Sequence, residues 1–165
     1  MIEPRSAGED VVDTLTRAKN LIESRDYDSA ALLLFQVLDS DLAAPLRGEV
    51  LTNLGAALCM SARGQQGEDA LARLEEARSL LAKALTHRSR SQAPAAWATT
   101  RANLALVHLT RYEVTGNMDD LLSAHLALDG TEPALRSTND SALRDWINAI
   151  RDQLVELRDR RSFRR

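Results

Sequence analysis

Cysteine is almost absent from this chain, since Cys59 is the only one, and aromatic residues make up just 4% of it. A single cysteine excludes an internal disulfide and a cysteine-rich zinc site. Few aromatic and β-branched residues disfavour a large sheet, whereas the abundant Leu and Ala favour helices. The 165 residues are enough for one domain with a buried core. We therefore expect an all-α protein.

Long apolar runs and an excess of basic charge are also missing. No uninterrupted apolar stretch approaches the roughly 20 residues that a membrane-spanning helix needs. The first ten residues lack the apolar core of a secretory signal. The formal net charge of −3 gives no overall attraction to nucleic acid or anionic lipid. These absences predict a cytoplasmic protein with no membrane partner, and they make nucleic acid an unexpected partner.

Sequence patterns for catalysis are missing as well. The chain has neither a phosphate-binding loop nor a dinucleotide fingerprint. His87, His108 and His125 form no close-spaced pair of metal ligands, and each is expected in a linker, in helix packing or at the surface. Cys59 lies in an apolar segment, where a buried and inert thiol is expected. We therefore expect a protein that is not an enzyme and that has no catalytic residue, metal or cofactor.

Apolar residues at helical spacing, separated by Pro and Gly, predict seven helices. Five cover about residues 10–24, 27–38, 46–62, 74–85 and 94–114. A sixth contains Ala124 and Leu128 and is capped by Asp119 or Asp120, and Gly130 and Pro133 end it. The last helix begins after Asn139 or Asp140. Residues 1–9 are expected to form a flexible arm.

A period of 47 residues relates three stretches of the chain. It aligns Ala30 with Ala77 and Ala124, and it aligns Leu34 with Leu81 and Leu128. Each stretch places a small residue four positions before a Leu, so one helix face has a notch followed by a protruding side chain. A fixed period of 20 to 50 residues is typical of stacked helical arrays. Short connections further predict that the helices pair as antiparallel hairpins.

Residues 10–133 resemble three tetratricopeptide repeats. The pattern falls in the second unit at Leu51, Leu54, Gly55, Leu58, Ala77, Leu81 and Pro94. In the third unit the matching residues are Leu104, Ala105, His108, Ala124, Leu128 and Pro133. In the first unit they are Ala18, Leu21, Tyr27, Ala30, Leu34 and Pro45. Leu or His replaces most signature aromatics, and the period exceeds the usual 34 residues, so HEAT-like arrays stay an alternative.

The long repeat is similar to bacterial repeats that accompany CHAT caspase-like proteases. The resemblance implies a right-handed α-solenoid of about three antiparallel hairpins, followed by a capping helix over residues 134–158. In such proteins the first helices of successive repeats line a groove for a partner. That groove would be lined by Lys19, Ile22, Glu23, Glu49, Thr52, Asn53, Ala56, Cys59, Thr99, Ala102, Asn103, Leu106 and Leu109.

This groove is largely small and apolar, which suits an extended peptide or an amphipathic helix of a partner protein. We therefore expect a non-enzymatic adaptor or regulatory subunit, whose partner is a CHAT-type protease or another effector. The alternative is that neighbouring helices of the chain itself cover these residues. Asn53 and Asn103 stand at matching positions, but they lack the basic companions needed to grip a peptide carboxylate.

The C-terminal segment allows several interpretations. The apolar stripe of the last helix suits a cap over the end of an array, or alternatively a homodimer interface: Leu143, Trp146, Ile147, Ile150 and Leu154. A basic tail is expected over residues 159–165. Residues 158–165 carry +4, through Arg158, Arg160, Arg161, Arg164 and Arg165, and the rest of the chain carries −7. These arginines suit the end of a helix electrostatically, and the alternative is contact with nucleic acid or an acidic protein.

Overall fold

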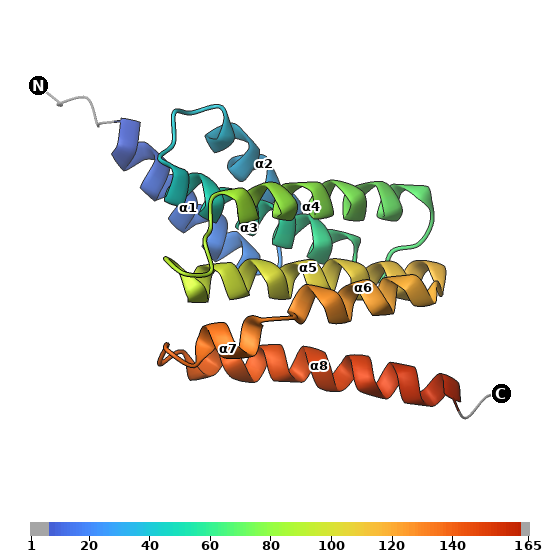
Figure 1. Cartoon of the computed structure of the whole chain (residues 1–165). Coiled ribbons are helices and arrows are strands. Elements are labelled where there is room, and N and C mark those ends of the chain that lie inside the picture. Colours follow the sequence, from blue (N-terminus) through green and yellow to red (C-terminus); the bar gives the residue numbers. More distant parts are fainter. Residues whose placement is uncertain (1–6, 163–165) are drawn as a thin grey trace, which may run out of the picture.

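The computed structural model describes residues 7–162, and all regular secondary structure in this range is helical (Figure 1). Its helices are α1 (Ala7–Glu23), α2 (Tyr27–Leu38), α3 (Ala44–Ala62), α4 (Glu68–Thr86), α5 (Pro94–Thr115), α6 (Met118–Leu128), α7 (Thr131–Leu135) and α8 (Ser141–Ser162). The all-α class that the composition predicted is therefore confirmed.

Local chemistry explains where these helices begin. The side-chain oxygens of Asp26, Asn117 and Asp140 accept hydrogen bonds of 2.9–3.3 Å from backbone N–H groups in the first turns of α2, α6 and α8. Each satisfies a donor that has no partner inside its helix. Pro45 and Pro94 lie in the first turns of α3 and α5, where a missing N–H removes no helical hydrogen bond.

Three helices extend beyond their predicted ends. α1 begins at Ala7, so the predicted arm of residues 1–9 is too long, and residues 1–6 lie outside the described range. α4 begins six residues before Leu74, directly after Gly67, whose φ of 89° favours glycine. α8 continues to Ser162, so the first part of the predicted basic tail is helical, and residues 163–165 lie outside the described range.

The short helix α7 was not expected from the sequence. Gly130 has a φ of 77° and precedes it, and Pro133 lies inside its first turn rather than ending a unit. Proline is tolerated there because the first backbone N–H groups of a helix have no intrahelical acceptor. The predicted capping segment of residues 134–158 therefore consists of the end of α7, a turn and most of α8.

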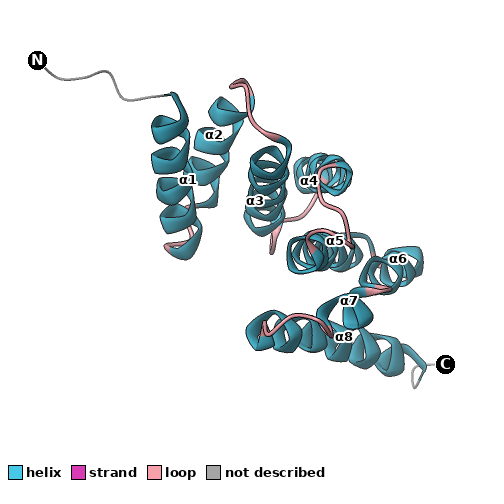
Figure 2. Cartoon of the chain, turned by 60° about the vertical axis from the view of Figure 1, so that its left-hand side comes forward, coloured by secondary structure: helices cyan, strands magenta, loops and turns pink. Residues whose placement is uncertain are grey.

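The helices pack largely in chain order, as Figure 2 shows. Each of the first five helices contacts the next one along the chain. In addition, α1 contacts α3, and α3 contacts α5. α7 packs against α5, and α8 packs against both α5 and α6. The odd-numbered helices α1, α3 and α5 are therefore neighbours, which is the arrangement that the predicted partner-binding surface requires.

The buried side chains form two cores. The first joins α1 to α4 and includes Val107 of α5, and the second joins α5 to α8. Leu104 and Leu106 pack against both cores, so they connect the two halves. Ala30, Ala77 and Ala124 are each 0% exposed, so all three positions related by the 47-residue period lie inside a core.

Candidate functional site

Nine of the thirteen residues predicted to bind a partner remain accessible or half-buried. They are Lys19, Ile22, Glu23, Glu49, Asn53, Ala56, Thr99, Asn103 and Leu106. Because α1 packs against α3 and α3 against α5, these side chains come from neighbouring helices. We call this set of nine residues the α1–α3–α5 face.

Two of the remaining residues, Thr52 and Cys59, are enclosed between α3 and α5. The Oγ1 atom of Thr52 lies 2.9 Å from that of Thr100, and the Cys59 Sγ atom lies 3.7 Å from Thr110 Oγ1. Both residues are almost completely buried. The prediction that they contact a partner therefore does not hold. Their polar groups instead join one helix of the chain to another.

Ala102 and Leu109 are also enclosed, on the other side of α5. They belong to the second core, which contains Leu128 of α6 and Ile147 and Leu154 of α8. The prediction of partner contact does not hold for these two residues either. Helices of the same chain cover these two residues, as the alternative interpretation of the groove predicted.

The charged end of the α1–α3–α5 face is held by an ion pair. Lys19 Nζ lies 2.6 Å from Glu49 Oε1, which links α1 to α3. The two side chains are 53% and 35% exposed, so water screens their attraction. A pair of this kind contributes about 0–1 kcal/mol to stability. Its main effect is to leave this end of the face nearly neutral.

The two asparagines of the face differ in their hydrogen bonds. Asn103 Nδ2 donates to the Thr99 backbone oxygen at 3.1 Å, within α5. Asn53 Nδ2 is shielded from solvent and has no hydrogen-bond partner among the described residues. An unsatisfied buried donor costs about 1–3 kcal/mol. The matching sequence positions of the two residues therefore do not give them matching environments.

α8 also carries apolar residues at the edge of its buried stripe. Trp146 and Leu157 are half-buried and pack against the second core, as does Leu106 of α5. Trp146, Gln153 and Leu157 are spaced by seven and four residues, so they share one side of α8. The sequence predicts Trp146 within a stripe that suits a cap or a homodimer interface, and the structure places it at the edge of that stripe, less deeply buried than Ile147 and Ile150.

A polar cluster joins α4, α5 and α6. Arg111 Nε lies 3.2 Å from Asp120 Oδ1, and Arg111 Nη1 lies 2.9 Å from Glu75 Oε2. His108 Nδ1 lies 3.8 Å from the same Asp120 oxygen. Burial lowers the pKa of His108, and the neighbouring Asp120 carboxylate opposes that effect only in part. The sequence does not predict the cluster, because Asp120 stands where a helix cap is expected and Glu75 is separated from Arg111 by 36 residues.

The nucleophile and ligand candidates show no catalytic arrangement. Burial raises the pKa of the Cys59 thiol to about 11, although the hydrogen bond with Thr110 opposes this, so the thiol is protonated at neutral pH. Within residues 7–162, no three His, Cys, Asp or Glu side chains lie close enough together to hold a metal ion. What α3, α5 and their neighbours present is an accessible surface of mixed polarity.

The basic end of the chain uses part of its charge within α8. Arg158 Nε lies 3.2 Å from Asp159 Oδ1, and Arg160 contacts Glu156 one turn away. All four side chains are exposed, so these are solvated surface pairs. Arg161, Arg164 and Arg165 have side chains outside the described part of the structure.

The chain was also compared with known proteins. It matches no family model, no characterised protein and no solved structure. Within the described helices, none is both long and apolar enough to cross a bilayer. The resemblance to tetratricopeptide repeats therefore depends on the sequence pattern alone.

Proposed function

We propose that this chain is a non-catalytic protein-binding module built as a tetratricopeptide-like α-solenoid. In this proposal α1–α2, α3–α4 and α5–α6 are three antiparallel hairpins stacked with a right-handed twist, and α8 caps the last one. The packing of each helix from α1 to α5 on the next, together with the contacts of α1 with α3 and of α3 with α5, supports the stack. The burial of Ala30, Ala77 and Ala124 supports the repeat.

The outer side of α8 supports its role as a cap. Asp145, Asp152, Glu156 and Asp159 are exposed and lie along the side of the helix opposite Ile147 and Leu154. Terminal units of a repeat array need such a polar outer surface to stay soluble.

One observation above all supports binding at the α1–α3–α5 face. Half-buried side chains recur on α3 and α5 with a spacing of 50 residues, as Glu49 and Thr99, Asn53 and Asn103, and Ala56 and Leu106. Such a row of small and polar residues along neighbouring helices leaves room for another polypeptide segment. We propose that this segment is an extended peptide or an amphipathic helix of an effector protein. A CHAT-type protease is the effector that the resemblance suggests.

Crosslinking followed by binding measurements tests this function. A photo-crosslinking amino acid at Asn103 should capture a partner in the cells that naturally make the protein, whereas the same group at exposed Ser79 on α4 should not. The affinity of the purified partner would then be measured by calorimetry for Ala56→Arg and for Ala82→Arg. Ala82 is exposed on α4, so it provides the matched control.

We expect Ala56→Arg to weaken binding at least tenfold, because a long charged side chain would occupy the face, and Ala82→Arg to leave it unchanged. Equal affinities for the two variants would exclude the α1–α3–α5 face as the binding site.

A second candidate function is self-association, and one observation favours it. Met118, Leu122 and Leu126 are 40%, 59% and 54% exposed and form one stripe along α6. Exposed apolar stripes often mark interfaces between proteins. This candidate differs from the α8 interface that the sequence indicated. Light scattering on the full chain and on Leu122→Lys tests it, because a dimer formed through this stripe would dissociate in the variant.

A further inference from the structure

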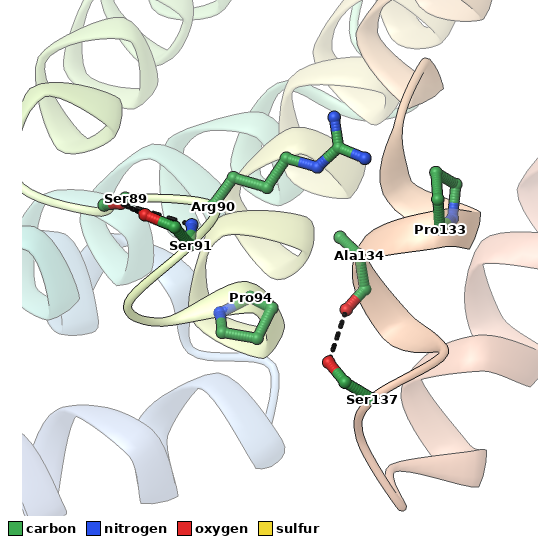
Figure 3. A pocket seen from close by; sticks show the side chains of 7 residues that line it. All are labelled: Ser89, Arg90, Ser91, Pro94, Pro133, Ala134 and Ser137. Atoms are coloured by element: carbon green, nitrogen blue, oxygen red, sulfur yellow. Dashed lines mark hydrogen bonds between the residues drawn. The ribbon is translucent and has the colours of Figure 1, made fainter.

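A pocket of about 430 Å³ lies between the connection that follows α4 and the segment around α7. It is lined by Ser89, Arg90, Ser91, Pro94, Pro133, Ala134 and Ser137. Figure 3 shows that the Arg90 side chain extends from the connection across the pocket toward Pro133 and Ala134. Hydroxyl groups lie on both walls, and no acidic side chain is among the lining residues. Ser137 donates its hydroxyl to the Ala134 backbone oxygen, and the Ser89 and Ser91 hydroxyls are hydrogen-bonded to each other at 2.8 Å. The pocket therefore combines one cation with apolar proline rings and a rim of serine hydroxyls.

The Arg90 side chain is held in place without using its hydrogen-bond donors. Its guanidinium carbon lies 5.6 Å from the centre of the Trp97 ring, within the range of a cation–π contact. A Cβ atom on Gly130 would lie only 3.2 Å from Arg90 Nη1, so the glycine leaves room for the guanidinium. Within the described residues, Arg90 forms neither a hydrogen bond nor an ion pair. Its planar set of N–H donors remains available to a ligand.

Two further arginines contact α5, and each has a carboxylate nearby. Arg101 lies on the Trp97 ring as well, 5.4 Å from its centre, and Asp129 is the carboxylate near it. Arg88 donates to the Ala96 backbone oxygen at 3.0 Å, and its nearby carboxylate is Glu49. Arg90 is the one charged residue among those that line the pocket.

We propose that this pocket binds the phosphate group of a phosphate monoester, with Arg90 as the residue that holds it. In a pocket open to water, the attraction between an arginine and a single carboxylate is weak. A doubly charged phosphate attracts Arg90 more strongly, and it accepts two parallel hydrogen bonds from a guanidinium.

The size of the pocket defines the rest of the ligand. Small-molecule sites generally measure about 300–1,000 Å³, so this pocket has room for an organic group beside the phosphate. Pro94, Pro133 and Ala134 provide apolar surface for that group. The ester can come from a phosphorylated side chain of another protein or from a small phosphorylated metabolite. This inference is independent of the α1–α3–α5 face and of any partner bound there.

NMR titration of the full-length, ¹⁵N-labelled protein tests the proposal. Sodium phosphate, a phosphoserine peptide and glucose 6-phosphate would be added at constant pH and ionic strength. We expect saturable shifts of the Ser89, Ser91 and Ser137 amide signals, with a dissociation constant on the order of 1 mM for phosphate alone. Both esters should bind more tightly than phosphate, and the ratio of their affinities shows which organic group the apolar walls of the pocket prefer.

The variant Arg90→Gln should weaken binding of all three compounds at least tenfold. Arg136→Gln is the matched control, because Arg136 is an exposed arginine just after α7 that does not line the pocket. This control should bind as the wild type does. An unchanged amide spectrum away from the pocket would show that both variants are folded. Equal affinities in the two variants, or shifts that sodium chloride reproduces, would overturn the proposal.

Discussion

Gly55 of α3 lies directly against Leu81 of α4: a Cβ atom on the glycine would be 2.6 Å from Leu81 Cγ and 3.2 Å from the Ala77 carbonyl oxygen. Real Cβ atoms do not come this close to other heavy atoms, so even one methyl group would force the helices to move. The repeat predicts a notch next to a protruding side chain, and this contact corresponds to that notch. Gly55 and Ala77 are the small residues, and Leu81 is the side chain that fills the space between them.

The first prediction concerns Gly55→Ala. Alanine normally stabilises a helix interior by about 0.5–1 kcal/mol relative to glycine, whereas overpacking a core costs about 1–3 kcal/mol. Leu81 is completely buried and cannot swing away, so we expect overpacking to dominate and the free energy of unfolding to fall by roughly 1–2 kcal/mol. Urea denaturation would measure this.

A double-mutant cycle with Leu81→Ala provides the control for this variant. Leu81→Ala removes the atoms that an alanine at position 55 would meet, so the cost of Gly55→Ala should shrink or reverse in that background. If Gly55→Ala is as stable as the wild type, the close approach of α3 and α4 is not as described.

The second prediction concerns Ala77→Leu. Ala77 is 0% exposed and faces α3, so the larger side chain should overpack the core by roughly 1–3 kcal/mol. For a domain of this length, each kcal/mol of lost stability lowers the melting temperature by about 2–4 °C. Ala82→Leu makes the same substitution at an exposed position of the same helix and should leave the melting temperature nearly unchanged. Identical melts for the two variants would contradict the burial of Ala77.

The sequence predicted the helical class and most helix positions, because strong local signals determine both. Pro45 and Pro94 lie in first turns as expected, and Asp140 caps the last helix. The early start of α4 was missed because only Ala70, Leu71 and Ala72 are apolar among its first six residues, which is too few to show a helical period. α7 was missed because Gly130 and Pro133 are typical of a loop and five residues are too few to show a period.

The partner-binding face was harder to predict for a different reason. Small or weakly polar residues such as Thr52 and Ala102 are compatible with an exposed groove and with a contact between helices. Only the three-dimensional packing shows that α5 and α8 lie against them. The polar cluster likewise joins side chains from three helices, and local spacing carries no information about such contacts. Asp120 therefore resembled a capping residue, while Asn117 is the actual cap.

The third prediction concerns Asp120→Asn. Asp120 is 7% exposed, and its carboxylate contacts Arg111 and accepts a hydrogen bond of 3.2 Å from Thr115 Oγ1. Removing its charge leaves Arg111 partly buried with only Glu75 as a counterion. Breaking a fully buried pair costs about 3–5 kcal/mol, but Arg111 is 30% exposed, so we expect roughly 1–3 kcal/mol.

Asp119→Asn provides a matched control for this third prediction. Asp119 is the neighbouring residue of α6 and is exposed, so its substitution should cost no more than about 0.5 kcal/mol. Chemical denaturation of both variants at neutral pH would measure the difference. Similar losses of stability would show that the buried position of Asp120 has no special energetic role.

The fourth prediction is a pH dependence caused by His108. Burial lowers its pKa below the usual value of about 6.5, because the charged imidazole loses hydration, while Asp120 favours the charged form and Arg111 and Arg78 oppose it. The folded state therefore binds the His108 proton more weakly than the unfolded chain does. The contribution of His108 to the free energy of unfolding is fully present above about pH 6.5. It declines as the pH falls from there toward the lower pKa of the folded state.

Urea denaturation of the wild type and of His108→Gln would measure this effect between about pH 5 and pH 7.5. Glutamine keeps a polar side chain of similar length but cannot take up the proton, so the stability of the variant should change less with pH over this interval. Protonation of carboxylates affects both proteins similarly, which makes the difference between the two curves the informative quantity. If both proteins lose stability equally as the pH falls, another group causes the change. If the wild type instead becomes more stable than the variant in acid, the attraction of Asp120 exceeds the cost of burying the charged imidazole.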